Sequence, residues 1–265
     1  RVSPAQIVAL ASGPVIVLLH VVWSVDRNRE PFLNVLKYLV IGALVLAPGC
    51  QVERFALGML GDPTADAANA SIPMLFAASV LGIGLVEELA KYAGLRLVAR
   101  RDRHLDEPFD WVVYGVTVAL GFALVENVLY VVNFGSEVAT TRALFAVPAH
   151  ALNGTLMGCR MARAATLEPR RAAEQRTLAL LEPVLWHGAY DFLAFAMSAR
   201  SEDAAVPVPV FEAAFGLLVL VQWVRSVNQV RGLLVEDEPM PPVLYPLART
   251  RFVRRRQHPP TSGAG

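Results

Sequence analysis

Charged residues are scarce in this sequence. Asp, Glu, Lys and Arg make up 18% of its 265 residues, against about 25% in a typical soluble domain. Hydrophobic residues make up 55%, and the mean hydropathy is +0.45, so most of the chain is suited to lipid. The net charge of +1 gives no basis for a nucleic-acid partner. Cysteine is equally sparse: Cys50 and Cys159 lie in different apolar segments, so we expect neither a disulfide nor a cysteine-based metal site.

Several apolar segments are long enough to cross a bilayer, which takes roughly 20 helical residues. We predict an all-α, polytopic transmembrane helical bundle of about seven spans, at residues 5–25, 36–60, 72–99, 109–134, 141–164, 177–199 and 206–227. Pro48 and Gly49 in the second span, followed by Glu53 and Arg54, predict a kink or an early end there. Residues 1–231 then form the transmembrane helical domain, and residues 232–265 form a basic, proline-rich cytoplasmic tail.

Arginines mark alternate loops between the predicted spans. They follow the first, third, fifth and seventh spans, and the intervening loops carry almost none. Because positive residues accumulate in short cytoplasmic loops, this pattern predicts an N-terminus outside the cell and a cytoplasmic C-terminus. The preference for arginine over lysine is typical of a GC-rich bacterial genome, so we expect a multi-pass protein of the cell membrane, namely a bacterial inner membrane.

Two adjacent acids, Glu87 and Glu88, lie in the middle of the third span, with Lys91 one turn further on. A charge at the centre of a spanning helix costs about 3 kcal/mol even on lenient insertion scales, so the pair indicates chemistry rather than packing. Ionisable residues continue through the next three spans, which contain Glu126, then His150, then His187 and Asp191.

These residues are expected to meet in one layer of the membrane. Counted from the outer ends of their spans, Glu126, His150 and Asp191 lie about 13 Å deep at 1.5 Å per residue, and the glutamate pair and His187 lie somewhat deeper. Lys91 shares a helix face with both glutamates, as His187 does with Asp191. Gly154 and Gly158 continue the face of His150 at intervals of four residues, so they predict the close approach of a neighbouring helix beside the histidine.

The motifs that these residues form resemble those of a known family. Glu87-Glu88-x-x-Lys91, Phe122-x-x-x-Glu126-Asn127, His150 and His187-x-x-x-Asp191 occur in this order, each within an apolar segment. The set resembles the PrsW family of intramembrane proteases, in the clan that includes CAAX prenyl endopeptidases. The resemblance implies hydrolysis of a peptide bond in a membrane-anchored protein substrate, such as a membrane anti-sigma factor, with the lipid bilayer as the other partner. The candidate catalytic residues are therefore Glu87, Glu88, Lys91, Glu126, Asn127, His150, His187 and Asp191.

Two mechanisms are compatible with these residue types. In one, Zn²⁺ is held by His150, His187 and either Glu126 or Asp191, with Glu87 or Glu88 as the general base. In the other, a glutamate activates water directly and the histidines bind the oxyanion. The number of available ligands favours zinc, although Asp191 can equally orient His187 from the same helix. Lys91 and Asn127 are candidates for supporting the reacting groups or for binding the oxyanion.

Other interpretations of the same residues make different predictions. A proton-coupled or cation-coupled transporter would need polar residues strung from one face of the membrane to the other, whereas here they form one layer. A CAAX-type prenyl endopeptidase would carry an arginine one position after Lys91 and a histidine in place of Glu126. A purely structural polar network is disfavoured because buried ion networks rarely improve on apolar packing. We interpret Arg142, Glu53 and Arg54 as interfacial residues near the outer boundary.

Overall fold

The computed structural model describes residues 3–26, 28–199 and 207–235, and within these ranges the chain forms helices and connecting turns without any β-strand. The helices are α1 (Pro4–Val25), α2 (Phe32–Met59), α3 (Ile72–Ala77), η1 (Ala78–Gly84), α4 (Leu85–Ala99), α5 (Asp110–Phe134), α6 (Glu137–Thr141), η2 (Arg142–Ala146), α7 (Val147–Thr166), α8 (Pro169–Ala199) and α9 (Val208–Val235). The two η segments are turns of π-helix.

Each predicted span coincides with a helix, so the all-α prediction is confirmed. The third span is the continuous run α3–η1–α4, and the fifth is α6–η2–α7. The alternative prediction, that the second span ends early, is wrong, because α2 continues through Pro48 to Met59. In the seventh, α9 continues past the predicted end at residue 227. The remainder of the predicted tail, residues 236–265, lies outside the described residues.

Five helical segments in the described part of the chain are long and apolar enough to cross a membrane: Gln6–Val25, Phe32–Met59, Ile72–Ala99, Asp110–Phe134 and Val208–Leu234. A polytopic membrane protein is therefore confirmed. The other two predicted spans, the α6–η2–α7 run and α8, are not among these five and carry more of the polar residues of the interior. The total of seven spans therefore stays a prediction, as does the orientation of the termini.

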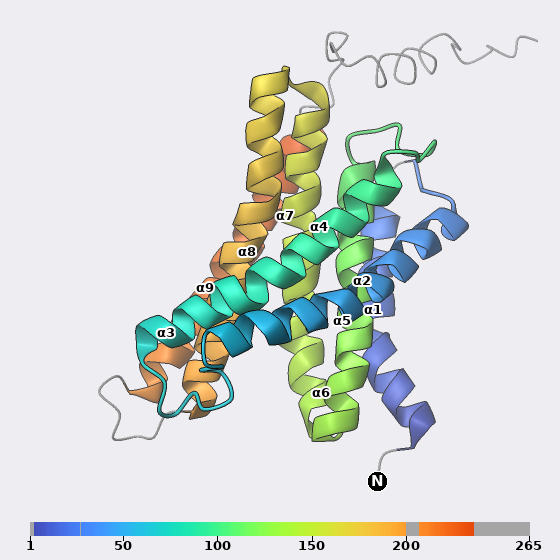
Figure 1. Ribbon diagram of the computed structural model, residues 1–265. Helices are drawn as coiled ribbons and strands as arrows, with labels where there is room; N and C mark the ends of the chain where they lie inside the picture. The colour runs from blue at the N-terminus through green and yellow to red at the C-terminus, as the bar shows by residue number, and fades with distance from the viewer. Residues whose placement is uncertain (1–2, 27, 200–206, 236–265) are drawn as a thin grey trace, which may run out of the picture.

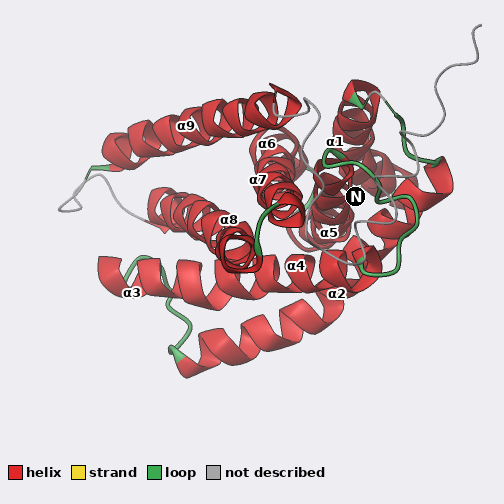
Figure 2. Ribbon diagram, turned by 90° about the horizontal axis from the view of Figure 1, so that it is seen from above, coloured by secondary structure: helices red, strands yellow, loops and turns green. Residues whose placement is uncertain are grey.

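Helix α5 is the centre of the bundle. In its most apolar window 72% of the residues are buried, against 11% in α1 and 17% in α9, which lie at the periphery. Helix α2 and the α3–η1–α4 run lie side by side across one face of the upright helices α5, α7 and α8 (Figures 1 and 2). Helix α9 lies on the side of α8 away from α2 (Figure 2). The helices that carry Glu126 and His187 therefore pack against the helix that carries the glutamate pair, and α7, which carries His150, packs between them against α5 and α8.

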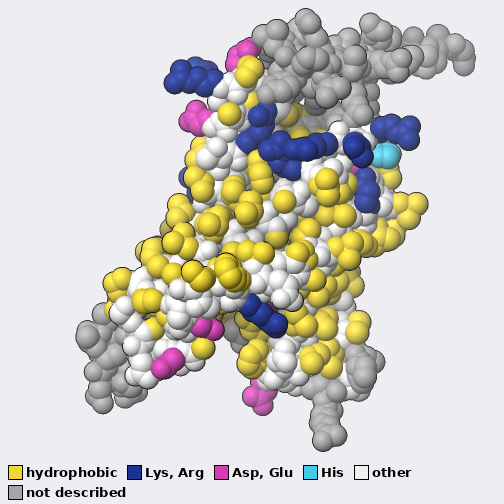
Figure 3. All heavy atoms as spheres, in the orientation of Figure 1, with side chains coloured by type: hydrophobic (Ala, Val, Ile, Leu, Met, Phe, Trp, Pro, Cys, Tyr) yellow, Lys and Arg dark blue, Asp and Glu magenta, His cyan; other side chains and the backbone are white. Residues whose placement is uncertain are grey.

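The surface matches a membrane environment. Hydrophobic side chains cover the middle of the molecule in the view of Figure 3, and Lys and Arg side chains gather toward the end where α4 finishes and α7 joins α8. Large apolar side chains such as Leu33 and Phe55 on α2 are more than two-thirds exposed. Since no water-facing domain would leave so much apolar surface uncovered, lipid is the natural solvent of these faces.

The predicted close approach beside His150 is present, and α5 is the partner. A Cβ atom added at Gly158 would lie 2.5 Å from the carbonyl oxygen of Trp111, and one at Gly154 would lie 2.6 Å from that of Gly115. These distances are below van der Waals contact, so only glycine allows the two backbones to touch. This contact sets how near His150 on α7 comes to Glu126 on α5.

We predict that Gly158→Ala destabilises the protein by about 1–3 kcal/mol, the usual cost of overpacking a well-packed interior. The matched control is Gly216→Ala on α9, where an added Cβ meets nothing within 4 Å and alanine is the better helix former. Thermal unfolding of the purified variants in detergent measures the difference. Equal melting temperatures for the two variants would contradict the backbone contact.

Candidate active site

The acid pair of α4 is buried and shares one cation. Glu87, Glu88 and Lys91 are 6%, 0% and 1% exposed. The Lys91 ammonium donates to Glu88 Oε1 at 2.8 Å and to Glu87 Oε2 at 3.2 Å. The predicted arrangement, with Lys91 between the two acids, is therefore what the helix adopts, and one of the two negative charges is offset within α4 itself.

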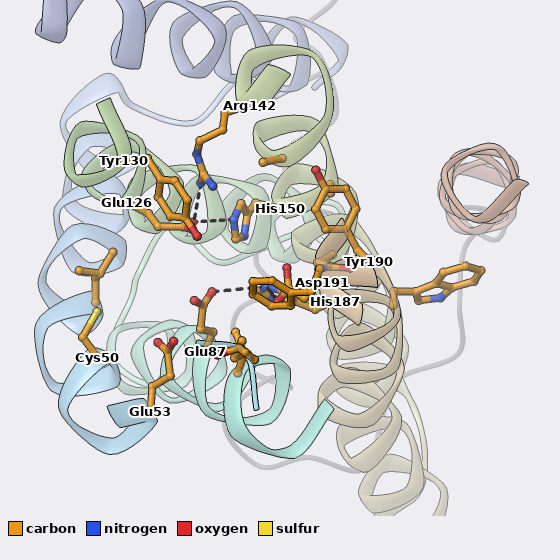
Figure 4. Close-up of a pocket in the computed structure, with 18 of the residues that line it drawn as sticks. Cys50, Glu53, Glu87, Glu126, Tyr130, Arg142, His150, His187, Tyr190 and Asp191 are labelled. Atoms are coloured by element: carbon orange, nitrogen blue, oxygen red, sulfur yellow. Dashed lines mark ion pairs between the residues drawn. The ribbon is translucent and has the colours of Figure 1, made fainter. Parts of the chain in front are cut away.

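His187 on α8 joins the acid pair from the opposite side. Its Nδ1 lies 2.7 Å from Glu88 Oε1, and since a carboxylate only accepts, Nδ1 is the donor. The other nitrogen, Nε2, lies 3.3 Å from Asp191 Oδ2 and 3.6 Å from Glu87 Oε2 (Figure 4). Glu88 thus fixes the His187 ring so that Nε2 faces two further carboxylates.

A second glycine contact makes this meeting possible. A Cβ atom added at Gly188 would lie 2.5 Å from Val80 Cα, and one at Gly84 would lie 2.9 Å from the Gly188 nitrogen. Gly188 follows His187 directly, and Gly84 ends the π-helical turn η1, three residues before Glu87. Backbone contact between α8 and η1 therefore places the histidine within hydrogen-bond distance of the acids.

His150 on α7 connects the acid pair to α5. Its Nε2 lies 2.8 Å from Glu126 Oε2, and its Nδ1 lies 2.9 Å from Lys91 Nζ. Lys91 is a donor without acceptor capacity, so Nδ1 is the acceptor in this contact. The rings of His150 and His187 meet edge to face with centroids 5.2 Å apart.

The eighth candidate, Asn127, contacts this network through Arg142, which we interpreted from the sequence as an interfacial residue. Arg142 on η2 donates through Nε to Asn127 Oδ1 at 2.5 Å, and its Nη2 forms an ion pair with Glu126 Oε1 at 2.9 Å. Its guanidinium also lies 3.8 Å from the ring centre of Tyr130. The interpretation of Arg142 as interfacial therefore does not describe its contacts; its place just inside a predicted span was the available signal.

These side chains line a cavity of about 300 Å³ between α2, α4, α5, α7 and α8 (Figure 4). Glu53, which we also interpreted as interfacial, lines this cavity from α2 beside Cys50. Among the candidates, the residues that line the cavity are Glu87, Glu126, His150, His187 and Asp191. Glu88 and Lys91 lie behind them. The structure therefore separates a set that faces the cavity from a set that supports it.

Two amides that the sequence analysis did not consider also reach the site. Gln222 on α9 donates through Nε2 to Asn153 Oδ1 at 2.7 Å, and Asn153 Nδ2 lies 3.5 Å from Glu88 Oε1. Both side chains are buried and both line the cavity. A buried glutamine in the last apolar span was the sequence signal, since lipid-facing helices rarely carry one.

Donor atoms of Glu87, His150 and His187 lie within 4.8 Å of one another, which suits a metal ion. Two imidazoles and a carboxylate form a ligand set that Zn²⁺ takes in catalytic sites. The hydrogen bond from His187 to Glu88 matches the carboxylate that commonly orients a metal-binding histidine. Both His150 nitrogens already have partners, so a metal at His150 would replace Lys91, which keeps Glu87 and Glu88. The residues present fit a metal, with Glu87 added to the predicted ligands.

A second acidic group lies at the other end of α5, where Asp26, Glu30 and Asp110 come together. Burial raises the pKa of Asp26 and of Glu30, so these acids keep their protons to higher pH than free carboxyls do. Tyr114 on α5 donates to Glu30, and Asn34 on α2 donates to Tyr114 at 2.5 Å. The group fastens the turn between α1 and α2 to the start of α5.

Comparisons with known proteins agree with the motif-based resemblance. The model of the PrsW family, described as intramembrane metalloproteases, matches residues 30–223, which include all eight candidates. Protease PrsW of Bacillus subtilis strain 168 is 33% identical over 226 residues, covering 85% of this chain and 98% of the relative. Protease PrsW of Geobacillus kaustophilus strain HTA426 is 29% identical over 244 residues, covering 90% and 97%. No solved structure matches the chain.

We predict that Lys91→Met severely destabilises the protein, by about 3–5 kcal/mol, because two buried carboxylates lose their shared cation. Adding Glu88→Gln to Lys91→Met removes one of the uncompensated charges and should recover part of the loss. Thermal unfolding in detergent of the single and double variants measures both effects. If Lys91→Met alone melts with the wild type, the lysine does not hold the pair.

Proposed function

Since the chain belongs to the PrsW family and is an intramembrane protease, we propose that it hydrolyses a peptide bond in a membrane-anchored protein of the bacterial inner membrane, such as a membrane anti-sigma factor. The observation that carries the proposal is the single cavity lined by Glu87, His150 and His187. The family match favours a protease over a transporter, and a PrsW-type protease over a prenyl endopeptidase.

Hydrolysis of an amide requires a group that takes a proton from water and returns it to the leaving amine. The water oxygen bonds to the carbonyl carbon, the carbon–nitrogen bond breaks, and the amine leaves with the proton. Of the two adjacent glutamates, Glu87 lines the cavity and therefore belongs to the reacting groups. Glu88 is fully buried and accepts from Lys91 and His187, so we assign it to holding those two residues.

We propose that Zn²⁺ is the cofactor, held by Glu87, His150 and His187. When bound, zinc polarises the scissile carbonyl and lowers the pKa of a bound water. Among the other carboxylates that line the same cavity, Asp191 lies 3.3 Å from His187 Nε2, so we assign it to accepting the proton. If the protease works without metal, Glu87 takes that role and the histidines bind the oxyanion.

We predict that replacing Glu87 with Gln leaves the substrate uncut in the membrane. Comparison of membrane proteomes from native cells carrying the wild type or Glu87→Gln should reveal a membrane-anchored protein that accumulates at full length in the variant. Its new terminus, found in wild-type cells, gives the cleavage position. Glu212→Gln is the matched control, because Glu212 is exposed on α9. Proteomes that do not differ between Glu87→Gln and Glu212→Gln would argue against the proposed reaction.

For the metal, we predict about one zinc per chain in purified wild type, the usual content of a single catalytic site. The double variant His150→Ala, His187→Ala should lose it. The double variant His20→Ala, His104→Ala removes two histidines from outside the cavity and should keep it. Elemental analysis of the three proteins decides the point, and wild type without zinc would establish the metal-free version.

A further inference from the structure

The second acidic group, made of Asp26, Glu30 and Asp110, brings three buried carboxyls together away from the active site. The three residues are 4%, 5% and 0% exposed, and one oxygen from each lies within 4.8 Å of the others. Asp26 and Glu30 belong to the turn between α1 and α2, and Asp110 is the first residue of α5. That turn and the loop between α4 and α5 lie at the same end of the molecule (Figure 1).

Each of these carboxyls is oriented by a hydrogen bond to one of its oxygens. Asp26 Oδ1 accepts from the backbone N–H two residues further on, at 3.0 Å. Asp110 Oδ2 accepts from two backbone N–H groups of the loop before α5, at 2.8 and 2.6 Å. Glu30 Oε2 accepts from the hydroxyl of Tyr114. The orientations of the three carboxyls are thus set by the protein itself.

Two further oxygens of the group, Asp26 Oδ2 and Asp110 Oδ1, are buried and accept no hydrogen bond from the described residues. A buried acceptor without a partner is costly. Both acids also act on the carboxyl of Glu30, so acceptors face one another. The Arg29 guanidinium, which lies over the Trp23 ring, offsets part of the charge at Asp26. With all three carboxyls ionised, 3 − 1 leaves two negative charges inside the protein.

Three carboxylates suit a hard divalent cation, because Mg²⁺ and Ca²⁺ bind oxygen ligands. A Ca–O distance of about 2.3–2.6 Å places oxygens on opposite sides of one ion about 5 Å apart, and the three oxygens here lie within that spread. Catalytic zinc sites carry histidine or cysteine ligands, which this group lacks. Its chemistry therefore differs from that of the histidine-containing group around Glu87.

We propose that Asp26, Glu30 and Asp110 bind one Mg²⁺ or Ca²⁺ ion, which fastens the turn between α1 and α2 to the start of α5. A divalent ion balances the two negative charges and gives the two unpaired oxygens a partner. The opposite half of α2 lines the active-site cavity with Cys50 and Glu53, so the ion holds one end of a helix that forms a wall of the cavity. The inference does not depend on the proposed protease function.

Thermal unfolding of the full-length protein in detergent tests the site. After treatment with EDTA, CaCl₂ or MgCl₂ titrated to about one hundred times the dissociation constant should raise the wild-type melting temperature by about 5–10 °C. The ion with the larger effect is the preferred one. Glu30→Gln keeps an oxygen for Tyr114 but loses the charge, so its melting temperature should rise much less, and Asp26→Asn repeats the test at a second ligand. Glu174→Gln, exposed on α8, is the matched control and should respond like the wild type.

Binding is read directly with Tb³⁺, which substitutes for Ca²⁺ and luminesces when a nearby aromatic side chain absorbs light. Trp23 Nε1 donates to the Glu30 carbonyl at 2.9 Å, and Tyr114 contacts the Glu30 carboxyl. Sensitised emission should therefore appear in the wild type, weaken in Trp23→Phe, decrease strongly in Glu30→Gln, and be displaced by the preferred ion.

The active site is told apart by Glu87→Gln, which removes a carboxylate from the cavity and should leave the response to Ca²⁺ or Mg²⁺ intact. If neither ion raises the wild-type melting temperature, or if Glu30→Gln responds like the wild type, the three carboxyls do not form a cation site. A response that disappears in Glu87→Gln would assign the ion to the active site and would equally overturn the proposal.

Discussion

One ammonium group holds the centre of this protein together. An ammonium has three donors, and that of Lys91 has three acceptors within 3.2 Å: Glu88, Glu87 and His150. Lys91 is 1% exposed, and a buried charge that loses a partner costs free energy, so each contact constrains the others. Helix α4 therefore cannot rotate, and α7 cannot withdraw, without breaking a buried hydrogen bond to His187 or to His150. His187 depends on the same centre through Glu88.

With every carboxylate ionised and both histidines neutral, the charges around this centre do not cancel within the chain. Four carboxylates, those of Glu87, Glu88, Glu126 and Asp191, face two fixed cations, Lys91 and Arg142, so 4 − 2 leaves two negative charges when both histidines are neutral. A buried excess of this size is costly in a low dielectric. A divalent cation between Glu87 and the histidines would balance it, which is the electrostatic reason for preferring the zinc version of the proposed reaction.

Such a network demands short distances, and glycine supplies them. Ion pairs in a dry interior repay their desolvation only at hydrogen-bond separation, while helices with ordinary side chains at the interface keep their axes 8–10 Å apart. The contacts of Gly154 and Gly158 with α5, and of Gly188 with η1, bring backbones into direct touch beside His150 and His187. The small residues next to the histidines are thus as necessary to the site as the charged ones.

The sequence predicted what depends on hydrophobic length and on regular helical spacing. The spans follow from apolar runs, and pairs such as Glu87 with Lys91 or His187 with Asp191 follow from a separation of four residues, which the α-helix preserves. Arg142 was misplaced because the period changes between it and His150: a π-turn depends on tertiary contacts and has no residue signature. Glu53 was misplaced for another reason. Its position near the end of α2 favoured the interface, and only the packing of α2 against α4 and α5 turns it to the cavity. In a regular helix, residue spacing predicts which side chains share a face. Across a change of helical period, it does not.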